Sequence, residues 1–533
     1  MRQTSDIAPE ADLSLSGQIM QIISRVTEYE LEELDPALEL EADLGIDSLV
    51  TENVLEEVEQ HFGLDAPMSI GRTRCLGDFV DAVAHALPKH AREGAPGNRY
   101  PAENDVLPDE FPAESTSEVL SAKDFAASRG DDLFTKAHEF AEWKADMDEQ
   151  QLIWYGKPHL TPSLSRSLIH DPVTESAREY LVFASNDYLG LANDPRVKQA
   201  AAEAILEFGV TNTGCRMVGG TNRLHVELEE KIAAFKGKPS AIVFPGGYSA
   251  NLGTIGALLG ANDTIVLDQF NHMSIMDGAV LSGARRRTFV HNDMDSLETI
   301  LTRSSSRGER TLIAVDGVFS MHGDICDLPR IVDLASAYGA RVLVDDAHAT
   351  GVIGPQGRGT AAHFGLTDSV DLELGTMSKA LGALGGFVAG ETDVIEYLRM
   401  YAHSYVFAAT IPAGIAASVS TALDIIVSEP ERLERLTRNR LRLVKLLNEA
   451  GLDSGETSSA VVPVLVGDEQ QAMRMGREVR SRGLFCQTVV YPGVPLGDAR
   501  LRLSVTSEHS NSDLQAAVEI IVEARAAVLG EHA

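Results

Sequence analysis

The feature that most constrains the fold is an alternation of short apolar stretches with helical stretches after about residue 136. The apolar stretches end in Gly, Asp, Ser or Lys, and they are SAIVFPGG, DTIVLDQ, RTLIAVDGVFS, ARVLVDDAH and VDLELGTMSK. Helical segments such as LPRIVDLASAYG lie between them. This β-α alternation predicts a doubly wound, mostly parallel α/β sheet over 136–430, with ligands at the carboxyl ends of its strands.

Two other regions differ from this pattern, and 533 residues are too many for one ordinary core. Residues 431–533 combine long helices with the strands AVVPVLVG and RLRLSVTS, which predicts a small α+β lobe. Residues 12–90 show helical periodicity without a strong strand pattern, which predicts an all-α helical bundle. Residues 91–135 are rich in Pro, Gly, Ala and Glu and are expected to form a linker.

The charge distribution limits the possible partners. The chain has a net charge of −34, which disfavours binding to nucleic acid or anionic lipid. Residues 1–90 hold 19 Asp and Glu against 5 Lys and Arg, a net of −14. Such a module suits docking to basic surfaces, although acidity also simply aids solubility.

Missing sequence features bear on the location of the protein and on metal binding. No apolar run is long enough for a membrane span, and the N-terminus has no signal-peptide core, so we expect a cytoplasmic protein. The scattered cysteines Cys75, Cys215, Cys326 and Cys486 predict neither a disulfide framework nor a metal cluster.

The stretch GTMSKALGALGG suggests a covalent cofactor. Lys379 follows a strand end, with Thr376 nearby and a glycine-rich stretch after it, as a Schiff-base lysine for pyridoxal phosphate (PLP) requires. Lysines are usually solvated, so the remaining parts of such a site must be found independently. Asp345 in VLVDDAHATG ends another strand, where a carboxylate can pair with the pyridine nitrogen, although helix capping is an alternative role.

Other motifs supply the remaining parts of a PLP site. In FPGGYSANLG, Gly247 and Tyr248 open a helix whose N-terminus favours a phosphate. His272 in DQFNHMSIMDG can stack on an aromatic ring, although a lone histidine is more often only hydrogen-bonded. GVFSMHGD offers Ser320 as a donor. In RLRLSVTSEH, Arg502 suits a carboxylate, with Arg500 as the competing choice.

These motifs together resemble those of the α-oxoamine synthases, a family of fold-type-I PLP enzymes. The resemblance covers 150–533 through SNDYLGLA, GCRMVGGTNRLHVELE, GGYSANLG, NHMSIMDG, DGVFSMHGD, VDDAHATGVIGPQGRG, GTMSKALGALGGF and LRLSVTSEH. It implies that Lys379 holds PLP covalently and that Asp345 pairs with the pyridine nitrogen. It further implies roles for residues around these two: His272 on the ring, His348 and Ser320 at its hydroxyl, Gly247, Tyr248 and Thr376 at the phosphate, and Asn186 and Arg502 at the amino acid.

The resemblance also implies a homodimer and a reaction. Thr410 in YVFAATIPAG would reach the neighbouring subunit's phosphate, but Ala408 and Ala409 stand where many members carry hydroxyl residues. The family joins an amino acid to an acyl thioester by decarboxylative Claisen condensation. The stretches GTMSKALGALGGF, VDGVFSMHGD and NHMSIMDG look closest to serine palmitoyltransferase-like members, which favours serine or alanine over glycine as the amino acid.

The N-terminal stretch LEADLGIDSLV resembles that of acyl and peptidyl carrier proteins. Ser48 matches the serine that receives 4′-phosphopantetheine, although it can also be a plain helix cap. The resemblance implies two further partners, a phosphopantetheinyl transferase and an acyl-loading enzyme. The architecture is similar to carrier-fused amino-ketone synthases, in which a tethered thioester meets its site at high effective concentration.

Three hypotheses follow from these motifs. The first is a condensing enzyme that uses the thioester on its own carrier. The second is the same enzyme with free acyl-CoA, the carrier serving another step. The third is a non-catalytic carrier and scaffold, which the joint presence of Lys379, Asp345 and His272 disfavours.

Overall fold

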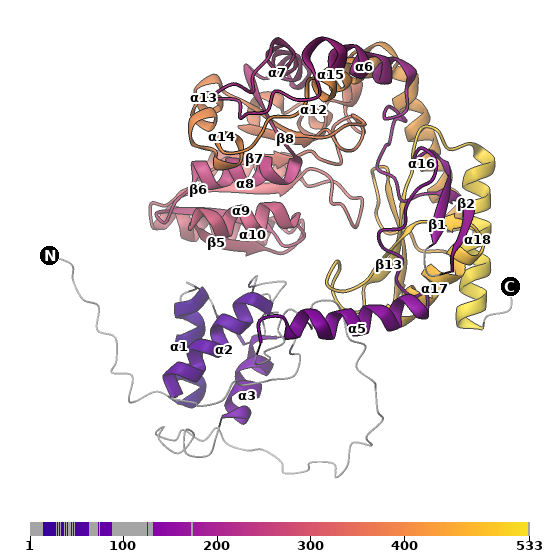
Figure 1. Cartoon of the computed structure of the whole chain (residues 1–533). Coiled ribbons are helices and arrows are strands. Elements are labelled where there is room, and N and C mark those ends of the chain that lie inside the picture. The colour runs from indigo at the N-terminus through magenta and orange to yellow at the C-terminus, as the bar shows by residue number, and fades with distance from the viewer. Residues whose placement is uncertain are drawn as a thin grey trace. The chain divides into compact units, whose positions relative to one another are not determined.

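The computed structural model describes residues 14–62 and 73–87 with gaps, residue 125, and residues 132–171 and 174–530. It divides into two units, Met1–Phe140 and Ala141–Ala533, and each is described by itself (Figure 1). Helix α5 (Thr135–Glu149) crosses the division between them.

The larger unit is built on a seven-stranded sheet of order β3-β9-β8-β7-β6-β4-β5. Its strands from β8 to β5 are parallel, whereas β9 is antiparallel to both of its neighbours. The predicted mostly parallel sheet is therefore confirmed. The strands are β3 (Ser240–Phe244), β4 (Asp263–Asp268), β5 (Arg285–Phe289), β6 (Arg310–Asp316), β7 (Arg341–Asp345), β8 (Leu372–Thr376) and β9 (Gly386–Gly390).

Helices bury both faces of this sheet (Figure 1). In β4, Ile265 packs with the core under α8 and α9, while its neighbour Val266 packs with the core under α10 and α11. Successive side chains of a strand point to opposite faces, so the strands read as continuous apolar runs. The helices are α6 (Pro195–Phe208), α7 (Arg223–Lys236), α8 (Gly247–Leu258), α9 (Met273–Ser282), α10 (Met294–Ser306), α11 (Leu328–Tyr338), α12 (Thr360–Phe364), α13 (Thr392–Tyr401), α14 (His403–Val406) and α15 (Ala413–Ser428).

The larger unit also contains a small lobe with two short sheets, of order β10-β13-β12 and β1-β2-β11, to which the segment before the main sheet contributes β1 and β2. The second sheet joins distant segments, because β2 pairs with β11 at Leu181 and Leu484. The strands are β1 (Arg166–Asp171), β2 (Ser176–Val182), β10 (Val461–Gly467), β11 (Leu484–Phe485), β12 (Gln487–Val489) and β13 (Ala499–Ser504), and the helices are α16 (Pro430–Glu449), α17 (Glu469–Ser481) and α18 (Asn511–Leu529).

The smaller unit contains helices α1 (Leu15–Thr27), α2 (Ser48–Phe62) and α3 (Leu76–Ala86). Val54, Leu55 and Val58 of α2 are buried in one core with side chains of α1 and α3, as the helical periodicity predicted. Ser48 is the first residue of α2, whereas nearly all of the predicted linker lies outside the described residues.

Within the described part of the chain, no helix is both long and apolar enough to cross a membrane. The same residues contain no group of three or more His, Cys, Asp or Glu side chains placed to hold a metal ion.

Candidate active site

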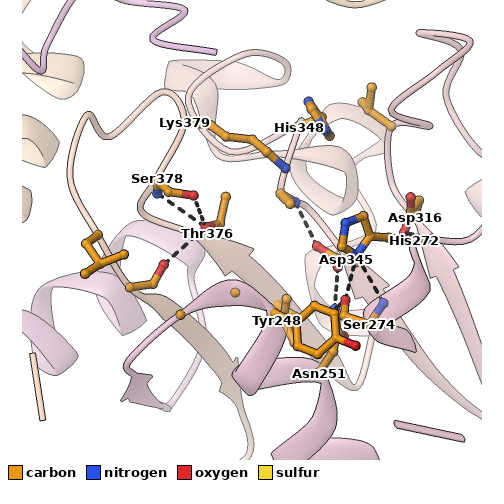
Figure 2. A pocket seen from close by; sticks show the side chains of 17 residues that line it. Tyr248, Asn251, His272, Ser274, Asp316, Asp345, His348, Thr376, Ser378 and Lys379 are labelled. Atoms are coloured by element: carbon orange, nitrogen blue, oxygen red, sulfur yellow. Dashed lines mark hydrogen bonds between the residues drawn. The ribbon is translucent and has the colours of Figure 1, made fainter. Parts of the chain in front are cut away.

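A cavity of about 320 Å³ lies at the carboxyl ends of strands β6, β7 and β8 and the N-terminus of α8 (Figure 2). It is lined by seven of the residues that the sequence singled out, namely Gly247, Tyr248, His272, Asp345, His348, Thr376 and Lys379. The remaining candidates do not line it: Asn186, Ser320, Thr410 and Arg502 lie elsewhere in the same unit, and Ser48 lies in the smaller unit.

Lys379 extends into the cavity three residues beyond the end of β8 (Figure 2). Burial lowers the pKa of its amine to about 8, although the nearby carboxylates of Asp345 and Asp316 oppose that shift. No carboxylate of the described residues forms an ion pair with Nζ. A substantial fraction of the amine is therefore neutral near pH 8, as a nucleophile or a proton acceptor must be.

Asp345 ends strand β7 and is only 4% exposed. Its Oδ2 accepts a hydrogen bond of 2.7 Å from Nδ2 of Asn251, and its Oδ1 accepts one of 2.9 Å from the backbone N–H of Ala347. These donors hold the carboxylate in one orientation toward the cavity.

His272 caps the N-terminus of α9 and opens into the cavity. The backbone N–H of Ser274 donates to Nδ1 at 3.2 Å, so the proton of the neutral ring is on Nε2. Desolvation lowers the pKa of His272, which keeps the ring uncharged at neutral pH. The Tyr248 ring lies edge-on to it with the centroids 6.4 Å apart.

Asp316 is a cavity residue that the sequence analysis missed. It ends strand β6, is paired in register with Asp345 on β7, and is 3% exposed. Burial and then the charge of Asp345 raise the pKa of Asp316 well above its usual range, which favours the protonated form of Asp316. The motif DGVFSMHGD contains Asp316, but only its serine drew attention.

The N-terminus of α8 lines the cavity next to the end of strand β8. A Cβ added at Gly247 would lie 3.0 Å from Oγ1 of Thr376, so glycine keeps the space beside Thr376 open. Oγ1 of Thr376 is in turn 2.7 Å from Oγ of Ser378. Free backbone N–H groups at a helix start, beside two hydroxyls, suit a phosphate.

The two arginines of strand β13 differ in their partners. Arg500 forms an ion pair with Asp498, whereas Arg502 has no carboxylate partner among the described residues. Arg502 is 2% exposed, and its Nε donates to the backbone carbonyl of Ser320 at 2.5 Å. A buried guanidinium without a carboxylate partner is the better candidate to bind a substrate carboxylate.

A chain of hydrogen bonds connects Arg502 with the cavity. Nη1 of Arg502 donates to Oγ of Ser504 at 3.2 Å, and that hydroxyl donates to Oδ1 of Asn186 at 3.0 Å. The Tyr188 hydroxyl lies 3.2 Å from the same oxygen and 2.7 Å from Nδ1 of His348. Burial keeps the pKa of His348 well below its usual range, so this ring is neutral. Tyr188 and Ser504 stand in the quoted motifs but were not singled out from the sequence.

Thr410 does not line the cavity of its own chain. Its Oγ1 lies 3.5 Å from Nε2 of the buried His225, beside a helix cap rather than a phosphate site. Its role toward a neighbouring subunit stays a prediction.

The cavity residues fit PLP. They provide an amine of lowered pKa, a fixed buried carboxylate, a neutral imidazole and a helix N-terminus kept open by glycine. These are the groups that PLP needs for its aldehyde, its pyridine nitrogen, its ring and its phosphate.

The aminotransferase class I and II profile matches residues 178–521, and the phosphopantetheine attachment site profile matches residues 17–83. The 4-hydroxy-2,2′-bipyrrole-5-methanol synthase PigH of Serratia sp. is 44% identical over 97% of this chain and 81% of its own length. Serine palmitoyltransferase of Sphingobacterium spiritivorum is 43% identical over 65% of this chain and 86% of its own.

Solved structures agree with these relatives. A serine palmitoyltransferase from S. paucimobilis superposes with a TM-score of 0.71 at 32% identity, covering 75% of this chain and 100% of its own. Another serine palmitoyltransferase structure, which contains PLP, reaches the same TM-score at 33% identity. The chain therefore belongs to the α-oxoamine synthase family of PLP-dependent acyltransferases and carries an N-terminal phosphopantetheine-binding carrier domain.

Proposed function

We propose that the protein condenses a small L-amino acid with an acyl thioester carried on Ser48 and releases CO₂. The product is an α-amino ketone, and the carrier thiol is set free. Serine and alanine are the favoured amino acids and glycine is the third candidate. One observation carries this proposal: a carrier domain at 17–83 shares a chain with an α-oxoamine synthase domain, whose family consumes thioesters.

The smaller unit supports Ser48 as the attachment point. Ser48 is the first residue of α2 and falls inside the range 17–83 that the phosphopantetheine attachment site profile matches. The buried side chains Val54, Leu55 and Val58 come later in the same helix. The N-terminal excess of 19 acidic over 5 basic residues suits recognition by a phosphopantetheinyl transferase and an acyl-loading enzyme with basic surfaces.

Three groups prepare the amino acid for reaction. Bound PLP supplies an electron sink for negative charge at the Cα of the amino acid. The Asp345 side chain, held by Asn251, pairs with the protonated ring nitrogen of that sink. Arg502 binds the carboxylate and so orients the Cα–H bond toward Nζ of Lys379, which accepts the proton.

The bonds then change in a balanced sequence. The Cα electron pair attacks the thioester carbonyl, the C–S bond breaks, and the departing carrier thiolate takes up a proton. The former carboxylate leaves as CO₂, and Lys379 returns a proton to Cα. The overall reaction takes up one proton from solvent. Burial lowers the pKa of His348 and raises that of Asp316, which favours the uncharged form of both side chains beside Asp345.

Intact mass spectrometry of the full chain tests this function. The protein is loaded with phosphopantetheine and an acyl group, and serine, alanine and glycine are added one at a time. We expect the acyl mass to disappear from the carrier with one of these amino acids and to persist without any. Ser48→Ala is the matched control, because it removes the attachment oxygen without touching the cavity.

Two outcomes would contradict the proposal. If Ser48→Ala still carries the phosphopantetheine mass, the attachment site is wrong. If the loaded acyl group persists with every amino acid while free acyl-CoA is consumed, the second hypothesis replaces the first. A wild-type chain that binds no PLP would leave only the scaffold hypothesis.

We further infer a cytoplasmic homodimer with the domain boundaries predicted from the sequence. Support for the dimer comes from large apolar side chains exposed on the larger unit, among them Leu206 at 88%, Val218 at 89% and Phe407 at 81%. Phe407 lies three residues before Thr410, in the segment that the resemblance directs to a neighbouring subunit.

A further inference from the structure

A charged cluster of His291, Asp268 and Asp324 contributes no side chain to the lining of the cavity. Nδ1 of His291 is 3.0 Å from Oδ1 of Asp268, and Nε2 is 2.9 Å from Oδ2 of Asp324. Only a doubly protonated ring donates from both nitrogens. Burial by itself lowers the pKa of His291, but the hydrogen bonds to the two carboxylates outweigh it and raise that pKa to about 9.

Asp268 connects this cluster to His272. It ends strand β4, and its Oδ1 also accepts the backbone N–H of Phe270 at 2.9 Å. Its backbone carbonyl accepts the N–H of Asn271 at 3.1 Å, one residue before His272. The carboxylate that binds His291 therefore also shapes the turn that delivers His272 to the cavity.

Asp324 connects the same cluster to Arg502. Its backbone carbonyl accepts the N–H of Phe319 at 3.1 Å, which closes the turn 319–324. Within that turn the carbonyl of Ser320 accepts from Nε of Arg502 at 2.5 Å, and the carbonyl of Met321 accepts from Arg500 at 3.1 Å. The turn thus touches strand β13 of the small lobe on one side and His291 on the other.

The other polar side chains next to His291 carry no positive charge, so they do not repel its protonated ring. Burial and then Arg500 lower the pKa of His322 to about 4, so this neighbouring ring is neutral. Asn292 donates to the carboxylates of Asp268 and Asp324 at 3.0 Å each, from its backbone and its side chain. Phe270 and Phe319 pack on the ring with centroids 4.8 and 4.4 Å away.

We propose that His291 is a positioning residue for the reaction: by holding Asp268 and Asp324 together, it sets His272 and the Arg502 guanidinium at their places around the substrate. The inference rests on the proposed function, since both groups matter only if PLP and an amino acid occupy the cavity. His291 itself touches neither.

The test uses the PLP-loaded full chain and needs no acyl group. L-Serine, L-alanine and glycine are titrated into wild type, His291→Gln and Asp324→Asn, and binding is followed by the visible absorbance and circular dichroism of the cofactor. We expect each variant to raise the apparent Kd of the bound amino acid by about tenfold and to alter the cofactor's dichroism. His363→Gln, at an exposed histidine of α12, is the control.

The double variant His291→Gln/Asp324→Asn separates positioning from general damage. If the two residues act as one unit, the double variant is no worse than the more affected single variant. Wild-type Kd and dichroism in Asp324→Asn, whose side chain keeps its shape, would overturn the proposal even if His291→Gln fails to fold. Wild-type protein that binds PLP but none of the amino acids would instead contradict the proposed function.

Discussion

At the scale of single residues, the chemistry of the site depends on how burial shifts the pKa of each acidic group and on which cations already have a carboxylate partner. Asp345 and Asp316 lie side by side on neighbouring strands, yet burial and the charge of Asp345 raise the pKa of Asp316 well above its usual range. Arg500 and Arg502 are two residues apart on one strand, yet only Arg500 has a carboxylate partner. Function at this scale follows from the partner and the degree of burial as much as from the residue type.

The two arginines yield the first prediction. Arg502→Lys removes the planar fork that can bind a carboxylate through two hydrogen bonds, so the KM for the amino acid should rise about tenfold or more. Arg500→Lys retains a cation beside Asp498 and should change KM less. Steady-state kinetics with the amino acid as the varied substrate decides, and a larger effect at Arg500 would reverse the assignment.

The second prediction concerns pH and His291. Its pKa is about 9 in the folded chain against 6.5 for the free side chain, so folding favours the protonated ring. This contribution to stability is complete below about pH 6.5 and is lost as the pH rises through about 9. The Tm difference between wild type and His291→Gln should therefore shrink from pH 6 to pH 10. A difference that stays constant or grows would show that the ring is uncharged.

At the scale of elements, the two ends of α8 (Gly247–Leu258) have different constraints. Gly247 begins the helix at the cavity, where an added Cβ would lie 3.0 Å from Thr376. Gly256 lies near the other end, where an added Cβ would meet Leu281 at an ordinary distance of 3.5 Å. The same substitution at these two glycines therefore separates phosphate binding from helix stability.

This contrast is the third prediction. Gly247→Ala should weaken PLP binding by about tenfold, because the methyl group crowds the helix start and Thr376. Gly256→Ala should leave PLP binding unchanged and stabilise the helix by up to about 1 kcal/mol. Equilibrium PLP titration and thermal unfolding measure the two effects. Equal PLP affinities in both variants would mean that the phosphate binds elsewhere.

Two strands of the main sheet escaped the sequence analysis, and each has a physical reason. Strand β5 begins with three consecutive arginines, Arg285 to Arg287, and carries no apolar run, because it lies at the sheet edge. Strand β9 has only Phe387, Val388 and Ala389 between glycines, and it runs antiparallel outside the β-α repeat. Its neighbours across the sheet supply the stability that its own composition lacks.

At the scale of the whole molecule, the proposed tether sets the kinetic order. When substrate and site share one chain, or one dimer, the thioester meets the cavity at an effective concentration that dilution does not change. The fourth prediction is that loss of the acyl group from the loaded chain, at saturating amino acid, keeps its rate constant over a hundredfold dilution of the protein. Rates that fall in proportion to protein concentration would show transfer between separate molecules.

The sequence by itself determined the fold class, the presence of a carrier region and seven of the cavity-lining residues, because periodicity and strand-end motifs are local properties. Lys379, Asp345 and His272 each follow or precede a recognisable element. Only the tertiary structure decided the raised pKa of Asp316, the lack of a carboxylate partner for Arg502 among the described residues, and the place of His291 between two carboxylates. These properties depend on burial and on partners tens to hundreds of residues away, and no local pattern records them.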